Sequence, residues 1–308
     1  MGIDVGTTNW KVGVFAPNAE PLIESCPART VTDAEGGSVY DPEELWRALE
    51  TLFGRFPPEL LQRVAHVGVT GMAEAGLLVE EKSGQPLTAI WPWFDPRGAR
   101  YARQAADRYR TTGLPLHGKY SVFKLLAMRE TLPLKGARWL GVPEYVVYRL
   151  TGAMQTDPTL AARTYAYSLP ENRYDFTWLR ELGLPEAIFP PVRPSGAPAG
   201  HVTGAKGFAP QATAAVCGHD HLLAAYACGA LDSGRPFLST GTAQVLLQQI
   251  PRRSLTEADA AGGLSFGPSV TGDGLVWLGS LQAAGGSINY WKHLTDAEYD
   301  RFWQLAGD

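Results

Sequence analysis

The sequence predicts an α/β protein whose two domains lie around a cleft. Residues 2–15 and 237–247 each contain two runs of alternating apolar and polar residues, typical of half-buried strands, joined by a Gly-Thr turn. Segments with helical periodicity and short apolar runs lie between these stretches. A chain of 308 residues is long enough for two domains. One hairpin in each domain would then face a shared ligand from opposite sides.

The turn of the first hairpin is suited to an anion. Gly6 can adopt a positive φ, and the tight turn directs backbone N–H groups and the hydroxyls of Thr7 and Thr8 at one point. Asp4 precedes the turn and Lys11 follows it. Because a carboxylate beside a phosphate needs a cation between them, Asp4 indicates Mg²⁺. The same residues also fit an ordinary surface hairpin, so both interpretations stay open here.

Composition limits the partners of the chain. Its residues are 45% hydrophobic and 19% charged, as in ordinary globular proteins. A net charge of −4 argues against a nucleic-acid or membrane partner, since both require a basic surface. No apolar run approaches a membrane span, and no signal-peptide segment follows Met1. Three cysteines without Cys-x-x-Cys spacing indicate reduced thiols in a cytoplasmic protein.

Several helices are expected in the first half of the chain, and one motif there is rejected. Residues 113–119 nearly match a P-loop, but Tyr120 stands where Ser or Thr would bind Mg²⁺, and a helix precedes the motif where a strand is needed. The helices are expected from a capped start at 41–44 and over 99–110, 121–129 and 144–150.

Two segments of this half are typical of ligand-binding loops. Glu74 lies in a glycine-flanked loop after a strand expected over 64–70, although this fragment alone favours a solvated loop acid. Residues 91–97, Trp-Pro-Trp-Phe-Asp-Pro-Arg, combine an aromatic wall with two charged side chains, which suits a sugar or polyol. A tryptophan-anchored core turn with an Asp–Arg pair explains them equally well.

A crossing between domains is predicted at 185–200, where five prolines occur. The predicted domains are therefore 1–200 and 201–308. In the second, an apolar run ends in Gly218-His219-Asp220-His221 and leads into a helical pattern. Asp220 would lie at a helix N-terminus, where the dipole favours a charged carboxylate that can accept a hydroxyl proton. The His-x-His spacing is only a weak signal for a metal site.

The second hairpin and one later segment complete the pattern. Thr240-Gly241-Thr242 forms a Gly-Thr turn between strands, about 235 residues after the first. Residues 284–291 open a helix with small residues, which allow a ligand to approach the backbone closely.

These motifs, in this order, resemble the FGGY family of carbohydrate kinases, within the actin-like ATPase superfamily. The resemblance covers essentially the whole chain. It rests on Asp4-x-Gly6-Thr7-Thr8-x-x-Lys11, Trp93-x-Asp95-x-Arg97, Tyr148-Arg-Leu-Thr-Gly152, Thr156-Asp157-Pro-x-x-Ala161, Gly218-x-Asp220 and Thr240-Gly241-Thr242. It implies two ribonuclease-H-like domains closing around a sugar and Mg·ATP, with the second domain expected to be incomplete in this chain.

The resemblance also implies a role for each matching residue. Asp4 would orient Mg²⁺, and Asp220 would accept the proton of the substrate hydroxyl. The residues implied in holding ATP are Gly6, Thr7, Thr8, Lys11, Gly241, Thr242, Gly285 and Asn289. Those implied in holding the sugar or polyol are Glu74, Trp93, Asp95, Arg97 and Asp220.

The chain departs from the family pattern in three respects. Ala73 stands where glycerol kinases of the family have arginine, and Val245 stands where they have an aromatic residue, which argues against glycerol as the substrate. The chain also ends before the stretch where the family usually has its adenine-binding glycines, and Met1 lies almost inside the first strand. The expectation is a fragment, or an adenine pocket that is built differently.

The sequence thus predicts a cytoplasmic kinase that uses ATP and Mg²⁺ to phosphorylate a small sugar, sugar acid or polyol. One alternative is a non-catalytic regulator that binds sugar or nucleotide on the same fold. The other is an actin- or chaperone-like ATPase, against which the aromatic segment and Asp220 argue. A homodimer is one option for the oligomeric state.

Overall fold

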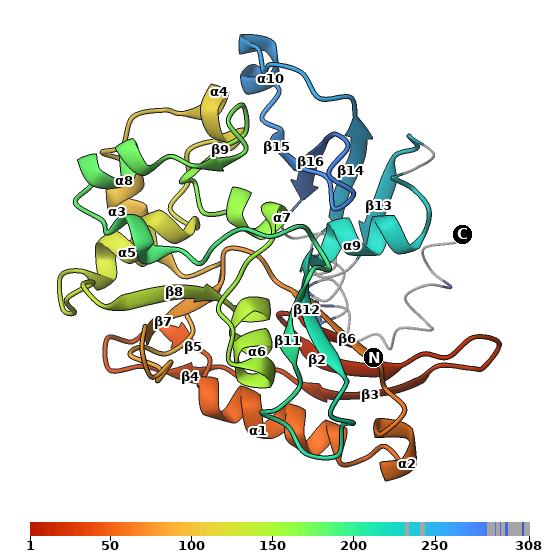
Figure 1. Cartoon of the computed structure of the whole chain (residues 1–308). Helices are drawn as coiled ribbons and strands as arrows, with labels where there is room; N and C mark the ends of the chain where they lie inside the picture. Colours follow the sequence, from red (N-terminus) through yellow and green to blue (C-terminus); the bar gives the residue numbers. More distant parts are fainter. Residues whose placement is uncertain are drawn as a thin grey trace.

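The computed structural model describes residues 1–231, 234–240 and 244–281, together with Ser287, Tyr290, 293–294 and Gln304. These residues form the α/β fold expected from the sequence, with one large and one smaller sheet (Figure 1). The large sheet has six strands and the smaller one has four.

The six-stranded sheet combines parallel and antiparallel strands. In spatial order they are β11 (Pro198–His201), β12 (Thr213–His219), β6 (His66–Gly71), β1 (Gly2–Val5), β2 (Asn9–Val14) and β3 (Leu22–Pro27). Strands β1, β6 and β12 run parallel. Their carboxyl ends therefore meet at one edge, which is where ligands bind in open α/β sheets. Strands β1 and β2 form the expected hairpin, with Asp4 opposite Lys11.

Helices α1 (Pro42–Phe53) and α6 (Val142–Thr151) pack against this sheet. Helix α1 begins as expected, because the Asp41 carboxylate accepts hydrogen bonds from the backbone N–H groups of Glu43 and Glu44 at 2.7 and 3.0 Å. Helix α6 ends where Gly152 adopts a φ of +77°. The apolar face that α1 buries in the core consists of Leu45, Trp46, Leu49, Leu52 and Phe53.

A second core lies around α5 (Ser121–Met128), in which every residue is buried. Helix α7 (Pro158–Ala162) packs between this core and the cavity described below. The other elements of the first 200 residues are β4 (Val31–Thr32), β5 (Ser38–Val39), α2 (Pro58–Leu61), β7 (Gly76–Glu80), η1 (Pro96–Gly98), α3 (Ala99–Ala102), α4 (Tyr109–Thr112), β8 (Ala137–Gly141), β9 (Tyr167–Ser168), β10 (Arg173–Tyr174), α8 (Phe176–Glu181) and η2 (Glu186–Ile188).

The continuous helix expected over 99–110 is wrong. The structure has two short helices there, α3 and α4, separated by a non-helical segment. The Asp107 carboxylate accepts a hydrogen bond of 3.0 Å from the backbone N–H of Tyr109. Aspartate side chains that bond the nearby backbone compete with helix formation and favour a new start.

The four-stranded antiparallel sheet follows. Its strands, in spatial order, are β13 (Phe237–Thr240), β14 (Gln244–Ile250), β16 (Leu275–Leu281) and β15 (Ser265–Pro268), and α10 (Glu257–Ala261) lies between β14 and β15 in the chain. Helix α9 (Asp220–Ala227) packs on this sheet through Leu222 and Ala225. Strands β13 and β14 pair antiparallel, as the second hairpin requires.

The large sheet extends past the domain boundary expected at residues 200 and 201. That boundary falls inside β11, and β12 pairs along its length with β6. The proline-rich segment therefore leads back to the first sheet, where β12 pairs in parallel with β6. No pattern in the neighbouring sequence indicates this pairing. The division into two domains stays a prediction. Among the described residues, no helix is long and apolar enough to cross a membrane.

Candidate active site

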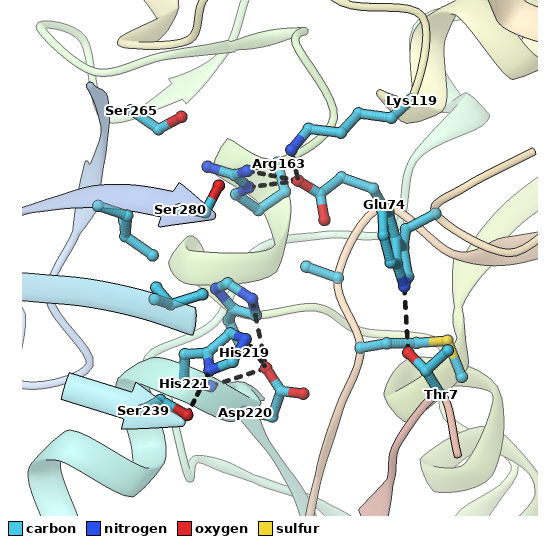
Figure 2. A pocket seen from close by; sticks show the side chains of 15 residues that line it. Thr7, Glu74, Lys119, Arg163, His219, Asp220, His221, Ser239, Ser265 and Ser280 are labelled. Carbon is cyan, nitrogen blue, oxygen red and sulfur yellow. Dashed lines mark hydrogen bonds and ion pairs between the residues drawn. The ribbon is translucent and has the colours of Figure 1, made fainter. Parts of the chain in front are cut away.

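A cavity of about 270 Å³ lies between the carboxyl edge of the large sheet and the four-stranded sheet (Figure 2). Its volume is close to the lower end of the range for small-molecule sites, roughly 300–1,000 Å³. Both sheets contribute to its walls. The lining residues are Thr7, Met72, Ala73, Glu74, Trp93, Lys119, Arg163, His219, Asp220, His221, Ser239, Val245, Ser265, Leu278 and Ser280.

Asp220 is the first residue of α9, directly after β12, as the sequence predicts. Its carboxylate accepts a hydrogen bond of 2.7 Å from the backbone N–H of His221. The same oxygen lies 3.3 Å from Nε2 of His219. Burial raises the pKa of Asp220 to about 7, and the negative charge of Glu74 adds to this, while the His221 N–H opposes it. A carboxylate with a pKa near neutrality is suited to accept a proton.

The start of α7 holds the junction between β12 and α9. The Thr159 hydroxyl accepts a hydrogen bond of 2.9 Å from the backbone N–H of His219, and it donates to the buried Asp157 carboxylate at 3.0 Å. The backbone carbonyl of Gly218 accepts a bond of 2.7 Å from the Thr70 hydroxyl. These contacts fix the chain on the N-terminal side of Asp220.

Gly218 is required at this junction, so Gly218→Ala should impair both stability and activity. Its φ is +103°, and an added Cβ would lie 2.5 Å from the Thr159 hydroxyl and 2.7 Å from the Asp157 carboxylate. The strain should cost about 1–3 kcal/mol, and a displaced Asp220 should lower kcat at least ~10-fold. Urea unfolding and steady-state kinetics measure the two effects. The control is Gly267→Ala, whose Cβ would meet only Ala162 at 3.9 Å; equal effects in both variants would contradict the prediction.

Glu74, Lys119 and Arg163 form a cluster of three charged side chains on the wall of the cavity opposite Asp220 (Figure 2). Oε1 of Glu74 accepts hydrogen bonds from Nε of Arg163 at 2.8 Å and from its Nη2. Nζ of Lys119 lies 3.6 Å from the same oxygen. Burial alone would raise the pKa of Glu74, but the charges of Arg163 and Lys119 outweigh it and hold the pKa well below its usual range. Glu74 is therefore a carboxylate at any physiological pH.

The buried Lys124 joins two loops of the site. Its ammonium group donates to the backbone carbonyls of Glu74 and Pro92. Burial lowers the pKa of Lys124 to about 7. Glu74 itself has a φ of +57°, an uncommon conformation for a residue with a side chain. Lys124 thus stabilises the turn that directs Glu74 into the cavity.

The first hairpin reaches the cavity through Thr7. The Thr7 hydroxyl accepts a hydrogen bond of 3.1 Å from Nε1 of Trp93, so the hairpin and the aromatic segment meet there. Asp4 lies just behind, with Oδ2 4.0 Å from Nζ of Lys11. Burial and the charge of Asp220 raise the pKa of Asp4 to about 6.

The chemistry of Asp4 fits a divalent cation. Its Oδ1 is buried and has no hydrogen-bond partner among the described residues, although buried carboxylate oxygens nearly always have one. The negative charge of Asp220 disfavours the charged form of Asp4. Mg²⁺ prefers one or two carboxylates together with phosphate oxygens and water, and Asp4 offers one such carboxylate.

Two residues expected at the sugar do not line the cavity. The Asp95 carboxylate accepts hydrogen bonds from the backbone N–H and Nε of Arg97, both at 3.0 Å. The Arg97 guanidinium also bonds to Asp33 at 2.6 Å and lies 3.5 Å from the ring centre of Trp91. The structure thus matches the alternative interpretation of this segment, a core turn with an Asp–Arg pair.

The other residues expected at ATP divide into two groups. Gly6, Thr8 and Lys11 belong to the first hairpin but do not line the cavity. Gly241, Thr242, Gly285 and Asn289 lie outside the described residues. The described strands beside the second turn do reach the cavity, through Ser239 and Val245.

Some lining residues were not expected from the sequence. Arg163 was missed, because it lies 89 positions from Glu74 and no local pattern marks it. Lys119 was noticed only as part of a rejected P-loop. His219 and His221 were noticed as a weak metal signal; one ligand atom from each of them and from Asp220 lie within 4.8 Å of one another. Burial lowers the pKa of both histidines, so they are neutral at pH 7.

Solved structures of known proteins show which class of proteins has this fold. The gluconate kinase from Lactobacillus acidophilus matches with a TM-score of 0.82 and 21% identity, over 94% of this chain and 61% of that chain. The xylulose kinase from Rhodospirillum rubrum matches with a TM-score of 0.85 and 19% identity, over 99% of this chain and 65% of that chain. The fold is therefore the one found in these sugar kinases.

The sequence comparison identifies the family. The model of the N-terminal domain of the FGGY family of carbohydrate kinases matches residues 1–227, and the chain belongs to this family. It is 31% identical to the glycerol kinase of Thermus brockianus in an alignment 287 residues long, which covers 86% of this chain and 56% of that protein. It is 26% identical to the L-fuculokinase of Haemophilus influenzae, over 79% of this chain and 58% of that protein. The chain thus spans less than two thirds of the length of these relatives.

Proposed function

We propose that the protein transfers the γ-phosphoryl group of ATP to a hydroxyl of a small sugar, sugar acid or polyol. The observation that carries this proposal is the position of Asp220, at the start of α9 in a cavity that also receives Thr7 and the strands of the second hairpin. Membership of a carbohydrate kinase family supports ATP as one substrate and a small sugar or polyol as the other. The cytoplasmic location and a homodimer stay predictions.

Asp220 acts as the general base. As the substrate oxygen attacks the γ-phosphorus, its proton passes to the Asp220 carboxylate. The new bond joins this oxygen to phosphorus, and the bond from phosphorus to the bridging oxygen breaks, which releases ADP. Phosphoryl transfer depends mainly on positioning and on charge stabilisation. The chain's main contribution to the reaction is therefore the positioning of the reacting groups around Asp220.

The first hairpin receives the phosphates. The Thr7 hydroxyl accepts from Trp93 and keeps its own proton to donate. Thr8 and Lys11 lie on the same hairpin, where they can meet the distal phosphates. Asp4 would hold Mg²⁺ through its unpartnered Oδ1, and the bound ion would neutralise negative charge on the phosphates.

Glu74, Arg163 and Trp93 position the other substrate. The Glu74 carboxylate and the Arg163 guanidinium offer acceptors and donors for hydroxyl groups, while the Trp93 ring suits a sugar C–H face. Ala73 and Val245 both line the cavity. Glycerol kinases have larger residues at these two positions. The smaller side chains of Ala73 and Val245 therefore support a substrate larger than glycerol.

An activity assay tests the proposal. The protein is mixed with Mg·ATP and a panel of pentoses, hexoses, polyols and aldonic acids, and ADP release is measured for each compound. We expect substrate-stimulated ADP release with at least one of them. Calorimetric binding of sugar and nucleotide without any ADP release would instead identify the non-catalytic regulator.

The pH dependence of kcat/KM reports the base. Because the pKa of Asp220 is raised to about 7, the free protein loses the base form as the pH falls. We expect kcat/KM to decrease about tenfold per unit below that pKa and to level off above it. Burial lowers the pKa of both His219 and His221, so neither is the group that gains a proton near pH 7. A profile that is flat between pH 5 and 8 would contradict the assignment.

A further inference from the structure

We propose that the substrate is a sugar acid of the aldonate type, whose carboxylate is selected by Lys119 and Arg163. This inference rests on the proposed function and narrows its substrate class. It follows from the charges that line the cavity opposite Asp220.

The cluster opposite Asp220 contains two positive charges and one negative charge. Lys119 and Arg163 both approach Oε1 of Glu74, and the three side chains are largely shielded from solvent. Figure 2 shows Asp220 on the other side of the cavity, beside His221 and Ser239. Shielded charges in proteins are normally paired. The cluster therefore lacks one negative charge.

Arg163 also has an unused hydrogen-bond donor. Its Nε and Nη2 bond to Glu74, whereas Nη1 is buried and has no partner among the described residues. Arg163 lines this cavity, and its planar guanidinium group matches a carboxylate in both charge and geometry. Burial lowers the pKa of the neighbouring Lys119, as expected for a cation whose charge is only partly compensated. A carboxylate beside these two groups would supply the missing charge and acceptor.

The position of the cluster suits a chain with an acid at one end. With its carboxylate at Lys119 and Arg163, an aldonate would extend across the cavity and place a distal hydroxyl near Asp220 (Figure 2). Ser265 and Ser280, which also line the cavity, would offer hydrogen-bonding hydroxyl groups to the chain of the aldonate. A neutral sugar bound in the same place would leave the second positive charge of the cluster without a negatively charged partner.

Calorimetry with matched compounds tests the inference independently of turnover. The pairs are D-gluconate with D-glucitol and D-xylonate with xylitol, which differ only in the group at C1. We expect each acid to bind at least ~10-fold more tightly than its polyol, as for one additional charge-assisted pair. Lys119→Met should abolish this difference, Lys119→Arg should retain most of it, and Lys82→Met, at an exposed position, is the control.

The outcomes separate the inference from the proposed function. If the polyols bind and are phosphorylated as well as the acids, the inference is wrong and the kinase function stands. Acids that bind with the expected preference but cause no ADP release would support the inference and contradict the kinase function. If none of these four compounds binds, the inference is wrong, and the wider activity panel decides on the kinase function. A preference for acids that survives in Lys119→Met would exclude Lys119 as the selecting residue.

Discussion

Asp220→Asn should lower kcat by about 10²–10⁴-fold, the range that a general base contributes, while the Kd of the sugar changes little. The amide has nearly the same shape as the carboxylate and can still accept the bond from the His221 N–H. It cannot accept the proton of the substrate hydroxyl. Steady-state kinetics and calorimetry with the best compound of the panel measure the two quantities.

A matched variant controls for the loss of one negative charge. Asp273→Asn makes the same change at an exposed position that does not line the cavity, and it should leave kcat within about twofold. If Asp220→Asn keeps more than a tenth of the activity, another group accepts the proton. If sugar binding is lost as well, Asp220 serves mainly to hold the substrate.

Arg163→Met should destabilise the protein by about 1.5–3 kcal/mol, the contribution of hydrogen bonds to a buried charged group. The variant removes the two hydrogen bonds to Glu74, and Lys119 at 3.6 Å replaces them only in part. The change in urea midpoint, together with the m-value, gives the loss in unfolding free energy.

Two further variants decide whether charge burial is the cause. Adding Lys119→Met to Arg163→Met should destabilise the protein further, because Glu74 then keeps neither of the two cations that pair with it. Arg180→Met breaks an ion pair with Glu186 in which both side chains are half exposed, at 59% and 50%, and should cost less than about 1 kcal/mol. A similar loss in Arg180→Met and Arg163→Met would show that Glu74 is not effectively buried.

Features that depend on neighbouring residues were predictable from the sequence. The cap and apolar face of α1, the two hairpins, and Asp220 at the head of α9 follow from short patterns, and the structure confirms them. The position of β12 beside β6 was not predictable in this way, because strand pairing over ~150 residues leaves no local pattern. For the same reason the sequence did not reveal that the chain after the proline-rich segment returns to the first sheet.

The site was predictable only where one motif carries the chemistry. Thr7, Glu74, Trp93 and Asp220 lie in such motifs, and the fold brings all of them to one cavity. Asp95 and Arg97 are residue types that also occur in sugar sites. They lie two positions apart in one turn, however, and bind each other. Arg163 gains its position only when α7 packs beside the Glu74 loop, which no single stretch of sequence describes.

The hydrogen bonds of Lys124 have a consequence for anyone who wishes to change the compound this scaffold accepts. A single ammonium group fastens the Glu74 and Pro92 carbonyls, so the two loops share one anchor and respond together. Libraries that vary only one loop would disturb the other through this anchor. Retargeting should therefore vary both loops jointly and retain the lysine.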